Sequence, residues 1–210
     1  NSVAAANLVT REVRSGSRDG QPTKSTIIRR TYPTDQADLW DIVTNKERLP
    51  RWFSPVTGDL REGGRYQIEG NAGGVIEGCS EPDSFALTWE FGDQVSWLRV
   101  KLEPAESGTT LEIIHEAFTG PFWDTYGPGA GGVGWDLAML GLGLHLQSGA
   151  AVDPETAMTF TFTPEGVEFV RVAAEAWAEA ATRDGEDPLA SKAAGERTFA
   201  FYTTVPEAEN

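Results

Sequence analysis

Two histidines are the residues in this sequence best suited to acid–base chemistry. His115 and His145 are the only histidines in the chain, and an imidazole exchanges protons near neutral pH. If both reach one cavity, they are the natural candidates for a catalytic acid and base. The alternative is that each is a hydrogen-bonded residue at the edge of a core. No H-E-x-x-H pattern contains them, so a zinc site would need additional carboxylates, and we expect no metal.

A single cysteine, Cys79, supplies the only thiol. A disulfide within the chain and a thiolate zinc cluster are therefore excluded, which fits a reducing, cytoplasmic setting. Because no base is recognisable beside Cys79, we expect it to pack rather than to act as a nucleophile. Glu69 and Glu77 would make an acid–base pair if both pointed inward, although solvated sheet edges explain them equally well.

A glycine pattern before the longest apolar segment resembles a dinucleotide fingerprint. Gly127, Gly129 and Gly132 fit G-x-G-x-x-G, and Asp153 follows about twenty residues later. Pro128 occupies the turn, however, and the strands that precede it are predicted to be antiparallel rather than part of a βαβ unit. We therefore expect these glycines to shape a loop that enters a helix, and we expect no cofactor.

The charge balance argues against two classes of partner. The chain has 17 basic and 32 acidic residues, which give a net charge of -15. Such a charge repels the phosphates of nucleic acids and anionic lipid headgroups, so neither is an expected partner. The most apolar run, residues 133–146, is shorter than the roughly 20 residues of a membrane-spanning helix.

The chain alternates between two kinds of pattern before residue 120. A β-branched and aromatic run predicts a first strand at residues 24–32, and the polar lead-in before it contains a turn signal that would suit half of a hairpin. Spacing of three between apolar residues predicts a helix at 34–44, and a second short helix is expected at 45–53. Regular hairpin spacing then predicts an antiparallel meander with one apolar face. Its strands are expected at residues 65–70, 74–81, 84–91, 95–103 and 109–118.

A long apolar helix at residues 132–147 is the natural cover for that face. Gly141 and Gly143 weaken this helix, which indicates either tight packing against the sheet or room for a ligand. Two more helices are expected, one from Thr163 to about Arg183 and one that begins at Asp187. Apolar and polar residues alternate in residues 157–163, so a strand is the alternative there. Trp97 shares an outward face with charged residues, so we expect the helix with Trp177 to cover it or to close a cavity.

The predicted elements follow the order of one strand, two helices, a meander and a long helix. Four segments accompany this order: TYPTDQADLWDIVTNKERLPRWF, GDLREGGRYQI, GGVIEGCSEPDSFALTWEF and GVGWDLAMLGLGLHL. In both respects the chain resembles the START-related (SRPBCC) superfamily. The branch it resembles is the activator of the heat-shock chaperone ATPase. The resemblance covers roughly residues 24–148. It implies an α+β helix-grip fold in which an antiparallel curved sheet wraps around a long helix. The expected organisation is an N-terminal arm at 1–23, a helix-grip domain at 24–149 and a docked helical extension at 150–210.

The resemblance also implies a cavity between the sheet and the long helix. Seven tryptophans are an excess, and indole rings line apolar pockets as well as cores. The residues expected around the cavity are Trp52, Phe53, Trp89, His115, Trp135, Met139 and Leu142. Our preferred interpretation is a protein that binds an apolar or aromatic small molecule; the alternatives are a co-chaperone-like module that contacts a protein such as a chaperone, and a cyclase- or hydrolase-type enzyme. Sequence alone does not separate these functions, because one fold supports them all.

Overall fold

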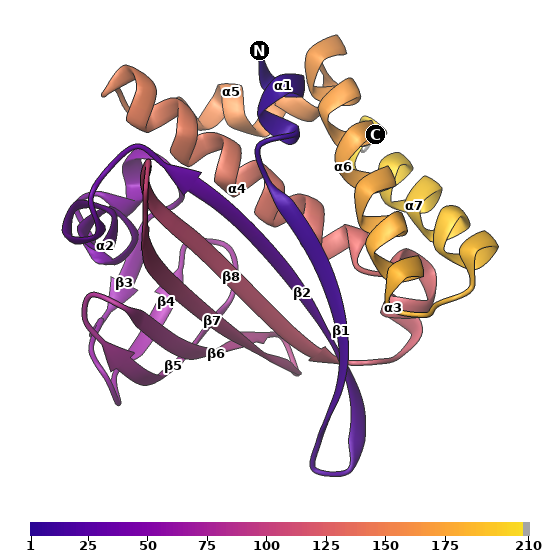
Figure 1. Cartoon of the computed structure of the whole chain (residues 1–210), viewed down its shortest axis with the longest axis horizontal. Helices are drawn as coiled ribbons and strands as arrows, with labels where there is room; N and C mark the ends of the chain where they lie inside the picture. Colours follow the sequence, from indigo (N-terminus) through magenta and orange to yellow (C-terminus); the bar gives the residue numbers. More distant parts are fainter. Residues whose placement is uncertain (208–210) are drawn as a thin grey trace.

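A computed structural model describes residues 1–207 of the chain. One antiparallel sheet, in the order β1-β2-β8-β7-β6-β5-β4-β3, curves around one side of a layer of helices (Figure 1). Its strands are β1 (Thr10–Arg18), β2 (Gln21–Tyr32), β3 (Val56–Gly58), β4 (Arg65–Ile68), β5 (Gly73–Ser80), β6 (Ser84–Phe91), β7 (Gln94–Ala105) and β8 (Gly108–Phe118). The helices are α1 (Ser2–Ala6), α2 (Gln36–Thr44), α3 (Pro121–Tyr126), α4 (Gly129–Ser148), α5 (Pro154–Thr159), α6 (Pro164–Arg183) and α7 (Pro188–Thr203), with short 3₁₀ turns at Leu49–Arg51 and Phe160–Phe162. The predicted α+β class and the predicted antiparallel meander are confirmed.

The N-terminal arm is half of a hairpin, as its turn signal indicated. β1 pairs along its whole length with β2, and Asp19 and Gly20, both with positive φ, form the turn between them. Two positive φ values in a row match the twist of a two-residue hairpin turn. The hairpin tip projects away from the rest of the molecule (Figure 1).

Several local expectations were wrong. The helix predicted at residues 45–53 is only the 3₁₀ turn Leu49–Arg51, because Pro50 cannot donate a backbone hydrogen bond. Residues 157–163 are helical rather than a strand, since α5 is followed directly by the turn Phe160–Phe162. The short elements α1, α3 and β3 were not predicted, because five, six and three residues are too few to show a period.

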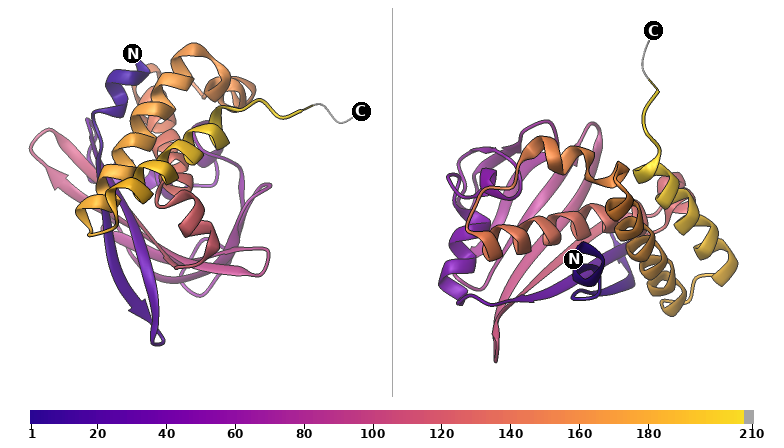
Figure 2. Two further views of the ribbon diagram at one scale, coloured as in Figure 1. Left: turned by 90° about the vertical axis from the view of Figure 1, so that its right-hand side faces the viewer. Right: turned by 90° about the horizontal axis from the view of Figure 1, so that it is seen from above.

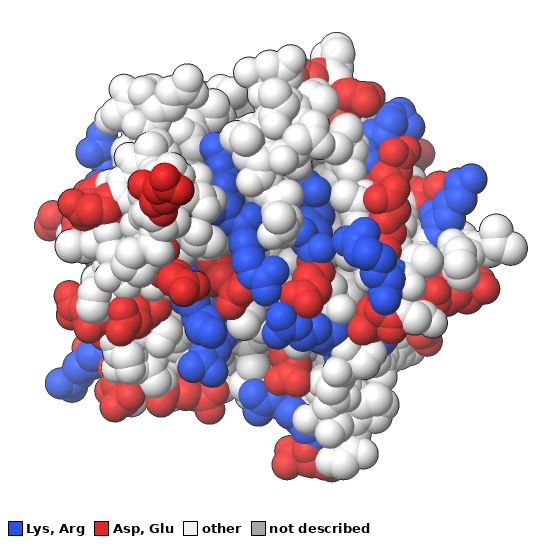
Figure 3. Space-filling view, in the orientation of Figure 1, with Lys and Arg blue, Asp and Glu red and all other residues white. Residues whose placement is uncertain are grey.

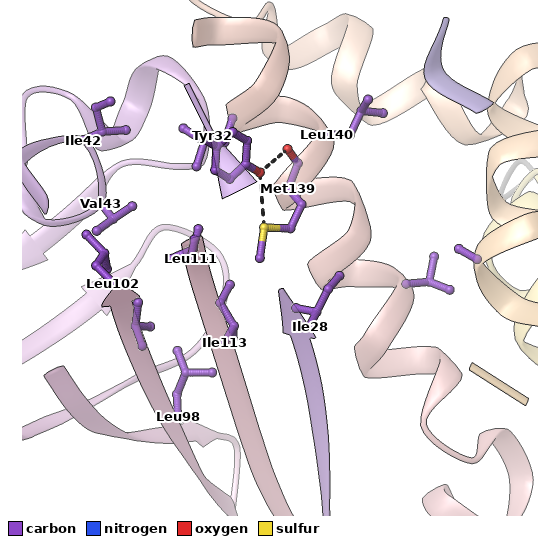
Figure 4. Close-up of a cluster of buried hydrophobic side chains, with 14 of the residues drawn as sticks. Ile28, Tyr32, Ile42, Val43, Leu98, Leu102, Leu111, Ile113, Met139 and Leu140 are labelled. Carbon is purple, nitrogen blue, oxygen red and sulfur yellow. Dashed lines mark hydrogen bonds between the residues drawn. The ribbon is translucent and has the colours of Figure 1, made fainter. Parts of the chain in front are cut away.

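The long helix α4 lies across the concave face of the sheet, where it packs against β2 (Figures 1 and 2). The contact is both apolar and polar. Ile28 and Ile113 face Met139 in the core, and the Tyr32 hydroxyl donates to the Met139 carbonyl at 2.8 Å (Figure 4). Burial raises the pKa of Tyr32, so its hydroxyl remains a donor across the physiological range. The predicted cover of the apolar sheet face is therefore the helix that the sequence indicated.

The last two long helices, α6 and α7, pack side by side, and α6 also packs against α4, α1 and β1 (Figure 2). Both start as expected. Thr163 caps α6 by accepting from the Gly166 amide, and Asp187 caps α7 by accepting from the Ala190 amide. On the face in Figure 3, basic and acidic side chains are interspersed. No helix in residues 1–207 combines the length and hydropathy needed to cross a membrane.

Candidate functional site

A cavity of about 360 Å³ lies between the sheet and the helices α2 and α4. Its wall combines residues of β3 to β8 with residues of α2, of the 3₁₀ turn and of the adjoining loops, and with one residue of α4. Seven aromatic side chains line it: Trp40, Trp52, Phe53, Tyr66, Phe85, Trp89 and Trp135. The remaining wall is mostly aliphatic, and volumes of this size accommodate a drug-sized molecule or part of one.

The sequence indicated four of these lining residues and missed three. Trp52, Phe53, Trp89 and Trp135 lie on the cavity wall. The missed residues are Trp40, Tyr66 and Phe85. Each had a usable signal, because Trp40 lies on the apolar face of α2 while Tyr66 and Phe85 alternate with outward residues on their strands.

Three other residues expected around the cavity, His115, Met139 and Leu142, do not line it. Met139 and Leu142 are almost completely buried in the core between α4 and the sheet. His145 is also buried, and its Nδ1 donates to the Ala150 carbonyl at 2.6 Å. That bond closes the end of α4, so the alternative of a histidine at the edge of a core describes His145. His115 and His145 are therefore not brought together in one cavity.

His115 lies behind the aromatic wall. Its ring is 5.5 Å from that of Trp89 and 5.9 Å from that of Trp135, and the two indoles are 5.3 Å apart. Edge-on packing at these distances stabilises all three rings. His115 thus supports two of the cavity's tryptophans from behind.

The hydrogen bonds of His115 determine its protonation. The Trp135 indole N–H can only donate, and it donates to Nδ1 of His115 at 3.2 Å. The proton of the neutral ring must then sit on Nε2, which donates to the Ser96 hydroxyl at 2.7 Å. Ser96 in turn donates to the Trp89 carbonyl at 3.3 Å. Burial lowers the pKa of His115 to about 4, so this neutral tautomer persists at neutral pH.

This arrangement differs from a serine–histidine catalytic pair. A histidine that activates a serine must accept the hydroxyl proton, yet Nε2 of His115 already carries a proton and donates. Its Nδ1 faces an indole donor rather than a carboxylate. The geometry fits positioning of Trp135 and Trp89 rather than proton transfer.

The other chemical candidates lie at the surface. Cys79 is exposed and lines the cavity mouth, rather than being packed inside as expected. Glu69 and Glu77 are both exposed, so the inward acid–base pair does not form. Within residues 1–207, no three His, Cys, Asp or Glu side chains come together as a metal site.

The far side of α4 carries a buried ion pair. Arg11 on β1 contacts Asp136 at 2.7 Å, and their side chains are 7% and 1% exposed. The Trp177 indole on α6 donates to the same carboxylate at 2.7 Å. Burial raises the pKa of Asp136, and the Arg11 guanidinium opposes that rise. One carboxylate therefore joins three segments that are distant in sequence.

The helix that contains Trp177, α6, neither covers Trp97 nor lines the cavity, so the role expected for it was wrong. The Trp177 ring is completely buried against Gly132 of α4, where an added Cβ would come within 2.4 Å of the ring. Trp97 is instead covered by Arg18, whose guanidinium lies 3.9 Å from the ring centre, and by the edge of Phe118. Trp177 thus belongs to helix packing and not to the cavity.

The glycines of α4 are explained by close packing. At Gly143, an added Cβ would come within 2.6 Å of the Arg30 guanidinium, and at Gly141 it would lie 3.0 Å from the Trp52 carbonyl. Arg30 uses this space to donate to the Met139 carbonyl at 3.3 Å. Of the two explanations left open for these glycines, tight packing is the one that the contacts favour.

Comparisons with known proteins agree with this architecture. Residues 33–122 match the family model described as activator of Hsp90 ATPase homolog 1-like protein. The solution structure of CalU16 from Micromonospora echinospora has a TM-score of 0.70 and 27% identity, and the match covers 84% of this chain and 97% of that one. Its crystal structure gives a TM-score of 0.65 and 26% identity, with coverage of 85% and 99%. Protein MLL2253 from Mesorhizobium loti, at 17% identity and a TM-score of 0.51, covers 59% of this chain and 98% of its own, and shows the fold alone. The search of curated proteins found no match.

The sheet wrapped around α4 defines a helix-grip protein. Within that class, residues 33–122 are similar to the family of activator of Hsp90 ATPase homolog 1-like proteins. The likeness to CalU16 extends beyond these residues. Residues 1–149 make up less than three quarters of the chain, so a match to 84% of it includes part of the C-terminal helices.

Proposed function

We propose that this protein binds an apolar, aromatic small molecule in the cavity between the sheet, α2 and α4. The observation that carries the proposal is the ring of seven aromatic side chains around a space of about 360 Å³. Aromatic walls bind flat apolar molecules through offset and edge-on contacts, and they release ordered water from the cavity when they do so.

The hydrogen bonds of the cavity wall favour an apolar ligand. The polar atoms of three wall residues are already bonded within the protein. Trp52 donates to the Ile42 carbonyl at 3.0 Å, Tyr66 to the Thr88 carbonyl at 2.6 Å, and Trp135 to His115. A polar group pushed against these atoms would lose its hydrogen bonds to water without replacing them, which costs free energy.

Binding of a neutral fluorescent probe tests the proposal. N-phenyl-1-naphthylamine should bind at one saturable site, with energy transfer from tryptophan to the probe. Val100 lines the cavity on β7, so Val100→Phe should fill the space and weaken binding at least about tenfold, as the loss of one buried ring contact implies. Val95→Phe is the matched control, because Val95 lies on the same strand but is exposed.

A second variant protects the test against misfolding. Thr44 lies half-buried at the edge of the cavity, where a larger residue is tolerated more easily than at Val100. Thr44→Phe should also weaken probe binding while near-UV circular dichroism stays native. Binding that is unaffected by Val100→Phe and Thr44→Phe in folded protein would refute the cavity as the site.

A second candidate function is contact with a chaperone, which the matched family model's description favours. Exposed aromatic residues support a protein-binding surface, since Phe122 is 63% and Phe201 57% exposed and Tyr126 packs against both rings. Stimulation of a purified Hsp90 ATPase by the chain would support this candidate. The double variant Phe122→Ser/Phe201→Ser should then abolish the stimulation without changing probe binding.

A further inference from the structure

The mouth of the cavity differs from its interior, because charged and polar side chains replace the aromatic wall there. Four lining residues are exposed: Asp41, Arg61, Cys79 and Glu81. We call these four residues the rim. A ligand whose ring lies among the tryptophans must pass the rim and leave one end beside it.

The charges at the rim are predominantly negative. Arg61 is the only basic residue of the rim, and its Nε donates to Asp59 at 2.6 Å. Asp41 and Asp38 share one cation, because Arg48 contacts Asp41 at 2.9 Å and Asp38 at 3.0 Å. The Arg48 hydrogen bond lowers the pKa of Asp41, so this carboxylate is ionised at neutral pH.

Two carboxylates at the mouth of the cavity have no cation partner in the part of the chain that the structure describes. Among residues 1–207, neither Glu81 nor Glu62 makes an ion pair. Glu62 accepts a hydrogen bond from the Cys79 amide at 3.1 Å, so it lies directly against the rim. The rim therefore carries two carboxylates, Asp41 and Glu81, with Glu62 beside it, whereas its one guanidinium group, that of Arg61, is already paired with Asp59.

The whole chain reinforces this local field, because its net charge is -15. A negative potential raises the local concentration of cations and lowers that of anions before any contact is made. It also opposes carboxylate and phosphate groups at the mouth. Fatty acids and phosphorylated molecules are thus unfavourable ligands, although their apolar parts would suit the interior.

We infer that the ligand is an amphipathic aromatic amine, with an apolar ring among Trp52, Trp89 and Trp135 and a protonated nitrogen at the rim facing Glu81 and Asp41. This inference rests on the proposed function and adds the ligand's charge and orientation to it. The polar atoms of the interior are bonded within the protein and supply no partner for an ammonium group. The rim supplies two solvent-exposed carboxylates: Asp41, which also contacts Arg48, and Glu81, which makes no ion pair among residues 1–207. The amine therefore stays hydrated on one side and is attracted on the other.

Three anthracene probes of equal ring size test the inference: 9-anthracenemethanol, 9-(aminomethyl)anthracene and 9-anthracenecarboxylate. At pH 7 they are neutral, cationic and anionic. At low salt we expect the cation to bind about fivefold more tightly than the neutral probe and the anion more weakly, as exposed ion pairs of this kind imply. Raising the salt to 0.5 M should reduce the cation's advantage to less than about twofold, because the rim charges are screened.

Variants assign the effect to the rim. Glu81→Gln should reduce the advantage of the cation by about half, and Asp41→Asn/Glu81→Gln should remove most of it, while affinity for the neutral probe is unchanged. The matched control is Glu179→Gln, because Glu179 is an exposed carboxylate on α6 at another surface. It should leave all three affinities as they are.

The outcomes separate the two proposals. If 9-anthracenemethanol does not bind, the proposed function fails and the inference fails with it. If the neutral probe binds but the cation binds no better, or if the cation's advantage survives in Asp41→Asn/Glu81→Gln, only the inference about ligand charge is overturned.

Discussion

Trp135 and Asp136 are neighbours on α4 that point into different surroundings. Trp135 lines the cavity and donates to His115, whereas Asp136 accepts from Arg11 and Trp177. Successive helical residues point about 100° apart, so one turn of helix reaches both surroundings. The ion pair between Arg11 and Asp136 thus helps to fix the orientation of α4. The position of Trp135 in the cavity wall depends on that orientation.

Breaking the ion pair from one side should destabilise the fold strongly. Arg11→Met leaves the Asp136 carboxylate buried without its cation, so we expect the free energy of unfolding to fall by about 3 kcal/mol. Arg11→Met/Asp136→Asn should cost clearly less than the sum of its single variants, because no unpaired charge remains. Urea unfolding of the four proteins measures this coupling. Additive losses would show that the pair does not act as a unit.

Two adjacent glycines of α4 should respond to alanine with opposite signs. At Gly132 a new Cβ would meet the buried Trp177 ring at 2.4 Å, so Gly132→Ala should destabilise the protein by about 2 kcal/mol. At Gly131 nothing lies within 4 Å, so Gly131→Ala should stabilise it by about 0.5 kcal/mol through helix propensity. Thermal unfolding of both variants provides the measurement. Equal shifts in Tm would contradict the packing of Trp177.

His115 should make the protein less stable in mild acid. Its pKa is about 4 in the folded state, against about 6.5 in an unfolded chain. Between these values the unfolded chain binds a proton that the folded chain does not, so the free energy of unfolding decreases as the pH falls through this window. Relative to pH 7, the expected loss at pH 5 is about 2 kcal/mol.

His115→Gln isolates this contribution. A glutamine can still accept from Trp135 and donate to Ser96, but it does not titrate. The carboxylates that titrate in the same range are unchanged, so the difference between the two proteins at pH 7 and pH 5 reports His115. Identical losses in both proteins would mean that His115 is protonated in the fold as readily as in the unfolded chain.

Cys79 offers a direct report on the rim. As the only thiol, exposed at the cavity mouth, it should react readily with a thiol reagent such as dithiobis(nitrobenzoate). A bound ligand should slow this reaction in proportion to the occupied fraction of sites. For the control, Cys79→Ser/Ser107→Cys moves the thiol to the exposed β7–β8 turn. A ligand that slows both thiols equally would not be bound at the rim.

Sequence patterns were enough for the architecture of this protein. Alternation in residues 65–118 predicts a half-buried antiparallel meander, because a period of two separates the faces of a strand. The cap residues Thr163 and Asp187 likewise predict where α6 and α7 begin. Such signals are local, so they survive without knowledge of the rest of the chain. Trp52, Phe53, Trp89 and Trp135 were expected around a cavity for a different reason, namely the resemblance to helix-grip proteins and the excess of tryptophans.

Tertiary structure decided which apolar residues face a space and which fill the core. Met139 and Trp135 share a helix and a similar pattern, yet the Tyr32 hydroxyl and the strand β2 enclose Met139 while Trp135 borders the cavity. The tautomer of His115 depends on an indole twenty residues away, and the partners of Asp136 come from both ends of the chain. These relationships arise from contacts between distant segments, which hydrophobic periodicity does not encode.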